Sequence, residues 1–246
     1  MIVSTLDKLE SRLLKHTAAN DAVGVRDTII RLCAELDIPS RGDPILVVRE
    51  PGITALIDRC AQLVFLANQP ELAALCAELI ICAASQLIAA DTPDRFSRLI
   101  RRALTLAEAS ENVSTLRRAL NNSAVTSLQT GNLTLSLVHA ARAYALSRKL
   151  GDTTGEISVI CNAMGALQSL GLHRECLAFA KLAQSLVIAD TTSATVRYAK
   201  AATLTNAAHS HVELQQYAAA AQAASQALLL LSTQSTAAEV WCATKR

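Results

Sequence analysis

The sequence predicts an all-α protein, and its composition carries this prediction. Apolar residues make up 51% of the 246 residues, whereas aromatic residues make up only 3%. The apolar residues are mostly Ala and Leu, which are strong helix formers, and the aromatic residues that favour strands are scarce. Eight Gly and five Pro leave few turn signals for a chain of this length. This composition favours helices packed through small side chains and excludes a disordered, a collagen-like or a small disulfide-rich chain.

Charge and cysteine content predict a cytoplasmic protein that binds neither nucleic acid nor membrane directly. Lys and Arg number 23 against 21 Asp and Glu, which gives no general attraction to phosphate or anionic lipid. The first ten residues hold charges and no apolar run, so no signal peptide is expected. The longest uncharged apolar stretch, residues 79–90, is too short to span a bilayer. The seven Cys include no CxxC pair, which favours reduced thiols.

The N-terminal region, residues 1–67, is expected to be helical and distinct from the rest of the chain. Apolar periodicity predicts helices over residues 6–16, 21–35 and 52–67. Between the last two, Pro39, Pro44 and Pro51 are too closely spaced for a helix interior. Residues 38–52 are therefore expected to form a long connection, with a short extended piece at 45–48.

From residue 68 onward, signals for helix starts and turns recur regularly. Pro70 and Pro93 are each expected at the first position of a helix, because proline fixes a helical φ and that position has no N–H partner to lose. Thr153 and Glu156 have the spacing of a capping box directly after a Gly-Asp pair. Helices of about 15 to 19 residues, joined by turns of about two to five residues, are expected to form hairpins.

Three sets of residues recur in this region at one fixed offset. Ala103, Ala143 and Ala183 lie 40 residues apart, and Ala227 follows after 44. The same offsets separate Asn122, Asn162 and Asn206, and also Gly131, Gly171 and Gln215. Extra loop residues at 189–194 explain the longer step. Three anchors that share one offset pattern indicate a tandem repeat.

These hairpins resemble tetratricopeptide (TPR) repeats, in particular the bacterial regulatory type with repeats of about 40 residues. The residues that carry the resemblance are Gly131, Leu133, Ala143, Gly171, Ala183, Gln215–Ala220, Ala224 and Ala227, whereas the family's Trp and terminal Pro are absent. The resemblance implies a right-handed α-α superhelix, a TPR-like solenoid, behind an N-terminal helical cap. Its repeats would cover residues 68–246, at about 71–110, 112–151, 152–191 and 193–234, with the start of a fifth at 236–246.

The resemblance also implies a binding site on the concave face, which the first helix of each hairpin lines. Residues at these positions are mostly uncharged amides and hydroxyls with one main basic group, which suits a protein or peptide partner or a small polar ligand. The recurrent Asn residues have two interpretations, ligand binding or bridging to a neighbouring helix. The expected site consists of Glu78, Arg118, Asn121, Asn122, Gln129, Asn162, Gln168, Asn206 and His209.

The sequence contains no evident pattern of catalytic or metal-binding residues, so we expect no enzyme activity, no metal and no cofactor. His209 and His211 are two residues apart, which directs their side chains to different faces of a helix. No glycine-rich phosphate-binding loop occurs. Arg95, Arg98 and Arg102 form a basic ridge on one helix, which we interpret as a solvated outer face.

The function implied by the resemblance is a sensory or regulatory module that binds a protein or small ligand and controls an attached effector. That effector could be a diguanylate cyclase (GGDEF) domain. The alternatives are a stand-alone protein-interaction adaptor and the repeat domain of a transcriptional regulator. Val240 and Trp241 would belong to a helix without a successor, so a following segment or a second copy, in a homodimer, is expected to cover them.

Overall fold

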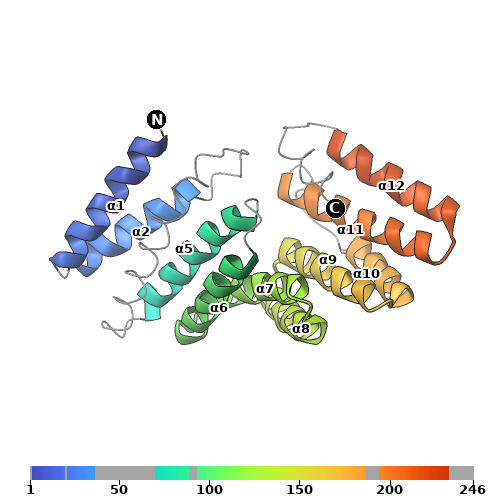
Figure 1. The fold of residues 1–246 in the computed structure, drawn as a ribbon, viewed down its shortest axis with the longest axis horizontal. Helices are drawn as coiled ribbons and strands as arrows, with labels where there is room; N and C mark the ends of the chain where they lie inside the picture. The colour runs from blue at the N-terminus through green and yellow to red at the C-terminus, as the bar shows by residue number, and fades with distance from the viewer. Residues whose placement is uncertain (1, 20, 37–69, 89–92, 187–193, 233–246) are drawn as a thin grey trace. The chain divides into compact units, whose positions relative to one another are not determined.

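The computed structural model describes residues 2–19, 21–36, 70–88, 93–186 and 194–232. These residues form ten α-helices and no strand, which confirms the predicted all-α class (Figure 1). The helices are α1 (Ile2–Ala18), α2 (Ala22–Leu36), α5 (Pro70–Ile88), α6 (Pro93–Ala109), α7 (Val113–Gln129), α8 (Leu133–Leu150), α9 (Thr153–Ser169), α10 (His173–Ser185), α11 (Ala194–Glu213) and α12 (Tyr217–Ser232). None of these helices is long and apolar enough to cross a bilayer.

The chain forms two compact units, residues 1–119 and 120–246, and the boundary lies within α7. In the first unit, α1 packs against α2, α2 against α5, and α5 against α6. Proline begins both α5 and α6, as predicted. The large side chains that are almost completely buried in this unit include Leu13, Ile29, Leu79, Ile80, Phe96, Ile100 and Leu106. This unit therefore has an apolar core of its own.

In the second unit each helix packs against the next one along the chain. The contacts run from α8 to α9, α9 to α10, α10 to α11 and α11 to α12, and α9 also packs against α11. The main core cluster joins α9, α10 and α11 and consists of Ile157, Ile160, Met164, Leu167, Cys176, Ala180, Ala183, Ala199 and Ala207. A smaller cluster joins α11 to α12 through Ala201, Leu204 and Ala227.

Most of the short turns contain one residue in the left-handed region. Within hairpins these residues are Gly131, Gly171 and Gln215, with φ of 76°, 72° and 58°. Between hairpins they are Glu111 and Gly151, with φ of 54° and 66°. After four of these five residues, the next N–H donates to a carbonyl five residues earlier, which is the Schellman pattern of a helix end. The turn at Gln215 therefore has the same backbone conformation as the turns that glycine marks in the sequence.

The residue after the left-handed one caps the next helix at three successive turns. Asn112, Asn132 and Asp152 each accept, through a side-chain oxygen, the backbone N–H three residues ahead, at 3.0, 3.2 and 2.8 Å. The predicted capping box placed the cap one residue too late, because Asp152 and not Thr153 caps α9. A carboxylate at this position accepts the free N–H and also faces the positive end of the helix dipole.

Small buried residues recur on the second helix of each hairpin. On α8 these are Ser136, Ala140, Ala143 and Ser147; on α10 they are Cys176, Ala180 and Ala183; on α12 they are Ala220, Ala223 and Ala227. Ala103 on α6 is also fully buried. The four recurrent alanines are thus all packing positions. Their small side chains allow helix axes to approach closely.

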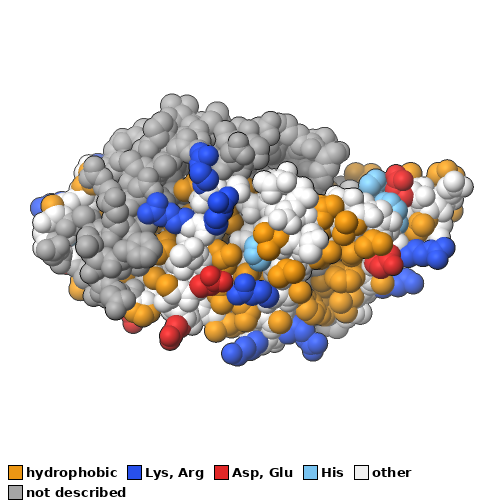
Figure 2. Space-filling model, turned by 60° about the horizontal axis from the view of Figure 1, so that its bottom comes forward, with side chains coloured by type: hydrophobic (Ala, Val, Ile, Leu, Met, Phe, Trp, Pro, Cys, Tyr) orange, Lys and Arg blue, Asp and Glu red, His pale blue; other side chains and the backbone are white. Residues whose placement is uncertain are grey.

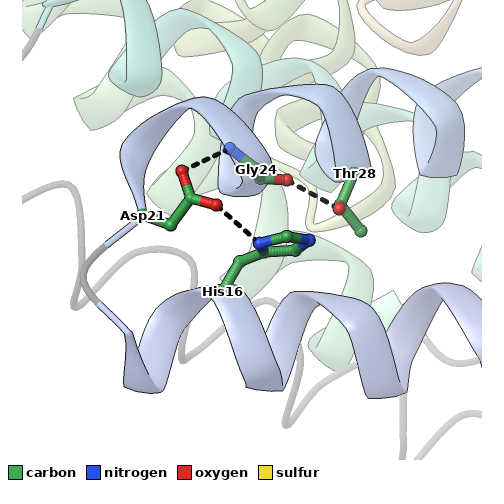
Figure 3. A network of polar contacts seen from close by, with 4 residues as sticks. All are labelled: His16, Asp21, Gly24 and Thr28. Atoms are coloured by element: carbon green, nitrogen blue, oxygen red, sulfur yellow. Dashed lines mark hydrogen bonds and ion pairs between the residues drawn. The ribbon is translucent and has the colours of Figure 1, made fainter.

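The first two helices overlap the predicted ranges, although α1 begins four residues before the predicted 6–16 and α2 is shifted by one residue, and they are tied together at their turn (Figure 3). Asp21 precedes α2, and its carboxylate accepts the Gly24 N–H at 3.0 Å and lies 2.8 Å from His16 Nδ1. The Gly24 N–H, followed by His16, lowers the pKa of the Asp21 carboxyl below its ordinary value. Thr28 donates to the Gly24 carbonyl at 2.7 Å. Asp21 therefore caps α2 and links it to the end of α1.

Several predictions concern residues outside the described part of the chain. These are the third N-terminal helix, the connection at 38–52, the extended piece at 45–48, the domain boundary at 67, most of the loop at 189–194 and the fifth repeat at 236–246.

Candidate partner-binding site

The predicted binding residues lie on α5, α7, α9 and α11, the first helices of the expected hairpins. Six of the nine form contacts between one first helix and the next.

Glu78 on α5 and Arg118 on α7 form an ion pair across 40 residues of sequence. Their side chains are 19% and 35% exposed, so solvent screens the pair partially. A pair of this kind contributes at most about 1 kcal/mol to stability. The carboxylate of Glu78 offsets the positive charge of Arg118, which the sequence identified as the main basic group of the expected site.

Asn121 on α7 contacts two residues of α9. Its amide oxygen accepts a hydrogen bond from Asn162 at 2.8 Å, and its amide nitrogen donates to the Ser158 hydroxyl at 3.4 Å. All three residues are half-buried. The amides of Asn121 and Asn162 therefore bridge neighbouring first helices.

Asn206 on α11 makes the equivalent contact to α9 and is buried. Its amide nitrogen donates to the backbone carbonyl of Cys161 at 3.2 Å, and Cys161 directly precedes Asn162. In the same way, the acceptor of the Asn162 amide is Asn121, whose side-chain oxygen accepts the bond and which directly precedes Asn122. Gln168 on α9 donates back to the Asn206 carbonyl at 2.6 Å and to the Ser210 hydroxyl at 3.2 Å. The recurrence of these bonds favours the helix-bridging interpretation of the Asn residues.

The remaining predicted residues are not gathered into one site. Asn122 is half-buried and Gln129 is exposed. His209 is exposed, its Nε2 lies 3.6 Å from Glu213 on the same helix, and its ring meets that of His173 edge-on with centroids 6.1 Å apart. Among the described residues, no group of three potential metal ligands is found.

A cleft of about 630 Å³ lies elsewhere, between α10 and α12 over α11. None of the nine predicted residues lines it. The α10 wall consists of Arg174, Leu177, Ala178, Ala180, Lys181 and Gln184. The floor is formed by Leu204, Ala207, His211 and Leu214, and the α12 side by Gln216, Ala219, Gln222, Ala223 and Gln226. The small side chains on α12 leave the space between the two second helices open.

The polar groups of this cleft are cations and amides. Its lining includes Arg174 and Lys181 on α10 and four Gln, and none of the described lining residues is Asp or Glu. Residues 120–186 and 194–232 carry seven Lys and Arg against four Asp and Glu. One amide is engaged within the rim, because Gln216 Oε1 lies 2.7 Å from His211 Nδ1. The cleft therefore offers positive charge and amide hydrogen bonding above an apolar floor.

A smaller cavity of about 150 Å³ adjoins the cleft, since Gln184, Leu204 and Gln226 line both. It adds Lys200 and Thr203 of α11 to the polar surroundings. Thr203 is buried and donates to the Ala199 carbonyl at 2.9 Å, so its hydroxyl is engaged within the helix.

Among the described residues of this unit, two titratable groups have shifted pKa values, and neither lines the cleft. Burial raises the pKa of the Cys176 thiol, and a hydrogen bond with Ser210 opposes this shift. Burial, followed by the negative charge of Glu156, raises the pKa of the Tyr144 hydroxyl. Both shifts keep the group protonated and hence poorly nucleophilic.

Exposed hydrophobic side chains also occur on these helices. Phe179 and Leu182 on α10 are 36% and 39% exposed, and Leu228 and Leu229 on α12 are each 67% exposed. Figure 2 shows one face of the molecule on which such side chains lie among Lys and Arg, with few Asp or Glu. Scattered exposed apolar residues are common on protein surfaces, whereas the cleft is concave and combines several kinds of group.

Sequence reasoning missed the cleft residues, although one signal for them was present. Arg174 and Lys181 are seven residues apart, and Gln222 and Gln226 are four apart, so each pair shares one helix face. Gln residues in a helix that consists mostly of Ala and Leu are a polar stripe without a packing role. The distance between α10 and α12, which opens the cleft, leaves no such signal.

The observed fold is an all-α chain of packed helices. No protein-family model matches the sequence, and no curated protein matches it. Among solved structures, the fold is similar to that of BtubC (BKLC) from P. vanneervenii, with a TM-score of 0.68. The similarity covers 96% of this chain and 92% of that one, at 12% sequence identity. At this identity the likeness shows the fold alone.

Proposed function

We propose that the chain is a non-catalytic protein-interaction module and that the cleft between α10 and α12 is its binding site. The cleft carries this proposal because it combines cations, amides and an apolar floor in one concave surface. These groups bind and orient a ligand by hydrogen bonds and charge. Among the described lining residues there is no Ser, Thr or Cys beside a base, which is the arrangement that covalent catalysis uses.

We further propose that the helices are TPR-type hairpins stacked as a right-handed superhelix. Two observations support this. Left-handed turn residues occur at 111, 131, 151 and 171, and small buried residues recur on the second helices at the 40-residue offset. In such arrays each hairpin contacts only its neighbours. The hydrogen bonds from α7 to α9 and from α9 to α11 connect neighbouring hairpins in this way.

In this proposal the polar residues of the first helices mainly stabilise stacking, and partner binding is the role of the cleft. Where an effector such as a GGDEF domain is attached, occupancy of the cleft would bias the effector between two states. Without an attached effector the same cleft serves an adaptor. Both versions require the binding step, so that step is the one to test first.

Site-specific photo-crosslinking in cells tests the binding step. A photoreactive amino acid replaces Gln222, which lines the cleft, or Ala221, which is exposed on the same helix and does not line it. We expect a crosslinked polypeptide from position 222 and none from position 221. Ala219→Phe, which places an aromatic ring at the α12 side of the cleft, should abolish the crosslink, whereas Ala221→Phe should leave it unchanged.

The opposite pattern would reject the cleft as the binding site. Equal crosslinking from positions 221 and 222, or a crosslink that persists in Ala219→Phe, would place the partner elsewhere. Crosslinks that form only from Gln129 or His209 on the first helices would restore the site expected from the sequence. Circular dichroism of each variant verifies that its helices are intact.

A further inference from the structure

We propose that the occupant of the α10–α12 cleft is an acidic peptide segment bound in an extended conformation. This inference rests on the proposed binding function of the cleft and adds the chemical class and the conformation of the ligand. Charge, hydrogen bonding and length each contribute to it.

The charge of the cleft selects an acidic ligand. Arg174 and Lys181 are both exposed on α10 and lie seven residues apart, which is about two turns or ~10 Å along the axis. No Asp or Glu occurs among the lining residues that the structure describes, so none of these residues competes for the two cations. A ligand carboxylate near either cation would gain a charge-assisted hydrogen bond. A basic ligand would meet two like charges and no compensating acid.

The amides of the cleft favour an extended backbone. Gln184 lies on the α10 wall, and Gln222 and Gln226 lie on the α12 side. Each amide donates and accepts, so each matches the backbone N–H and C=O groups that an extended peptide leaves unpaired. A helical ligand satisfies these groups internally and would leave the Gln amides without partners.

The length of the cleft fits a short extended segment. Its α10 wall runs from residue 174 to residue 184, which corresponds to ~15 Å of helix. An extended chain advances ~3.4 Å per residue, so about four or five residues would occupy it. Side chains alternate in such a segment, so acidic ones can face the cations while intervening apolar ones meet Leu177 and Leu204. Carboxylates two to four residues apart would reach both cations.

Nucleic acid fits the cleft less well than an acidic peptide. Among the described residues, its lining contains two with a full positive charge and no Phe, Tyr or Trp on which a base could stack. A lipid headgroup would satisfy the cations and would leave the amides on the opposite side unused. The combination of cations on α10 and amides on both sides therefore favours a peptide.

Fluorescence anisotropy with two labelled peptides tests the proposal. The probes are a short peptide of alternating Glu and Leu and a matched peptide of alternating Lys and Leu. We expect the wild-type chain to bind the Glu peptide at least about tenfold more tightly than the Lys peptide, and less tightly as salt increases. Ala219→Phe should abolish binding of the Glu peptide.

Two double variants with equal net charge separate the cleft from the overall field of the protein. Arg174→Glu with Lys181→Glu alters the cleft, and Arg148→Glu with Lys149→Glu makes the same charge change on exposed residues of α8 that do not line it. We expect the first to weaken binding of the Glu peptide about tenfold or more and the second by less than about threefold. Gln222→Ala with Gln226→Ala should weaken it without altering its salt dependence.

Each contrary result overturns the inference in a different way. Equal losses in the two charge-reversed variants would show non-specific attraction. If the Lys peptide is preferred and Ala219→Phe blocks it, the cleft binds peptides and the acidic class is wrong, while the proposed function survives. Helical circular dichroism induced in the bound Glu peptide would reject the extended conformation. If neither peptide binds and no crosslink forms from position 222, the proposed function fails as well.

Discussion

The backbone at Gln215 adopts a conformation that glycine occupies at the equivalent turns. Its φ of 58° lies close to the 72° of Gly171 and the 76° of Gly131. A side chain in this region costs roughly 1 kcal/mol, because Cβ approaches the following carbonyl oxygen. At Gly171 an added Cβ would meet no neighbouring atom within 4 Å, so the cost there comes only from the backbone.

The first prediction concerns these two turn residues. Gln215→Gly should raise the free energy of unfolding by about 0.5–1 kcal/mol, and Gly171→Ala should lower it by about 1 kcal/mol. The urea midpoint at constant transition slope measures both changes. Gln216→Gly, at the next residue with an ordinary negative φ, is the control and should give no gain. A loss of stability in Gln215→Gly would contradict the assigned turn.

The second prediction concerns Asp21 and pH. The folded pKa of its carboxyl lies below the unfolded value of 3.8, first because of the Gly24 N–H and then because of His16. Its contribution to stability is therefore complete above pH 3.8 and is lost as the pH falls through the lower folded pKa. Asn at this position keeps the cap but not the charge. The stability difference between wild type and Asp21→Asn should thus shrink below pH 3.8.

Thermal unfolding monitored by circular dichroism between about pH 6 and pH 2 measures this difference. Asp27→Asn, an exposed carboxyl within the same helix, serves as the control. If the stability difference between wild type and Asp21→Asn stays constant across the acid range, the charge of Asp21 does not stabilise the start of α2.

At the scale of elements, local signals in the sequence predicted several helix starts and turns. Pro70 and Pro93 each begin a helix, because proline at that position loses no hydrogen bond. Gly131 and Gly171 mark turns, because left-handed φ favours glycine. The cap of α9 was misplaced by one residue, since Thr153 and Asp152 both suit the position and only the left-handed Gly151 before it decides.

Contacts between elements were less predictable than the elements themselves. The sequence left two roles open for Asn162 and Asn206, because an amide bonds equally well to a ligand or to a neighbouring helix. Only the approach of α9 to α7 and α11 distinguishes the two. The pairing of Arg118 with Glu78 was equally invisible, since it depends on the relative rotation of α5 and α7.

The third prediction tests the bridging role. Asn206→Ala should lower the free energy of unfolding by about 1–2 kcal/mol, because it removes a buried hydrogen bond to α9. Amide hydrogen exchange should rise in α9 and α11. His209→Ala, exposed on the same helix, should change stability by less than about 0.5 kcal/mol. Unchanged stability in Asn206→Ala together with lost partner binding would restore the ligand-binding interpretation.

At the scale of the whole molecule, the sequence predicted the all-α class and did not predict the cleft. Helix class follows from composition and periodicity, which a single sequence contains. The cleft depends on the distance between α10 and α12, two helices that are not consecutive in the chain. Ala180 and Ala223 are buried packing positions, and they also line the cleft. A small side chain can either allow two helices to pack closely or leave open space between them. The presence of Ala in the sequence therefore does not show which of the two occurs.

The fourth prediction concerns the cysteines of the whole chain. Cys76, Cys82, Cys161 and Cys176 are buried, and burial raises the pKa of the Cys176 thiol. A thiol reagent should therefore react slowly with these positions in the native protein, because the thiolate is the reactive form. After anaerobic denaturation all seven thiols should titrate, and reductant should leave the melting temperature unchanged. A large loss of stability on reduction would reveal a structural disulfide.

The spacing of the turns also governs how a chain of this kind can change in length during evolution. Left-handed residues at 111, 131, 151 and 171 alternate between two sorts of turn, one within a hairpin and one between hairpins. A duplication or deletion running from Glu111 to Gly151 inserts or removes two helices and rejoins equivalent backbones. An event half as long would bring a second helix, with its face of small buried residues, where a first helix with bridging amides is required. Gain and loss in whole hairpins is therefore the route that leaves the remaining helices correctly paired.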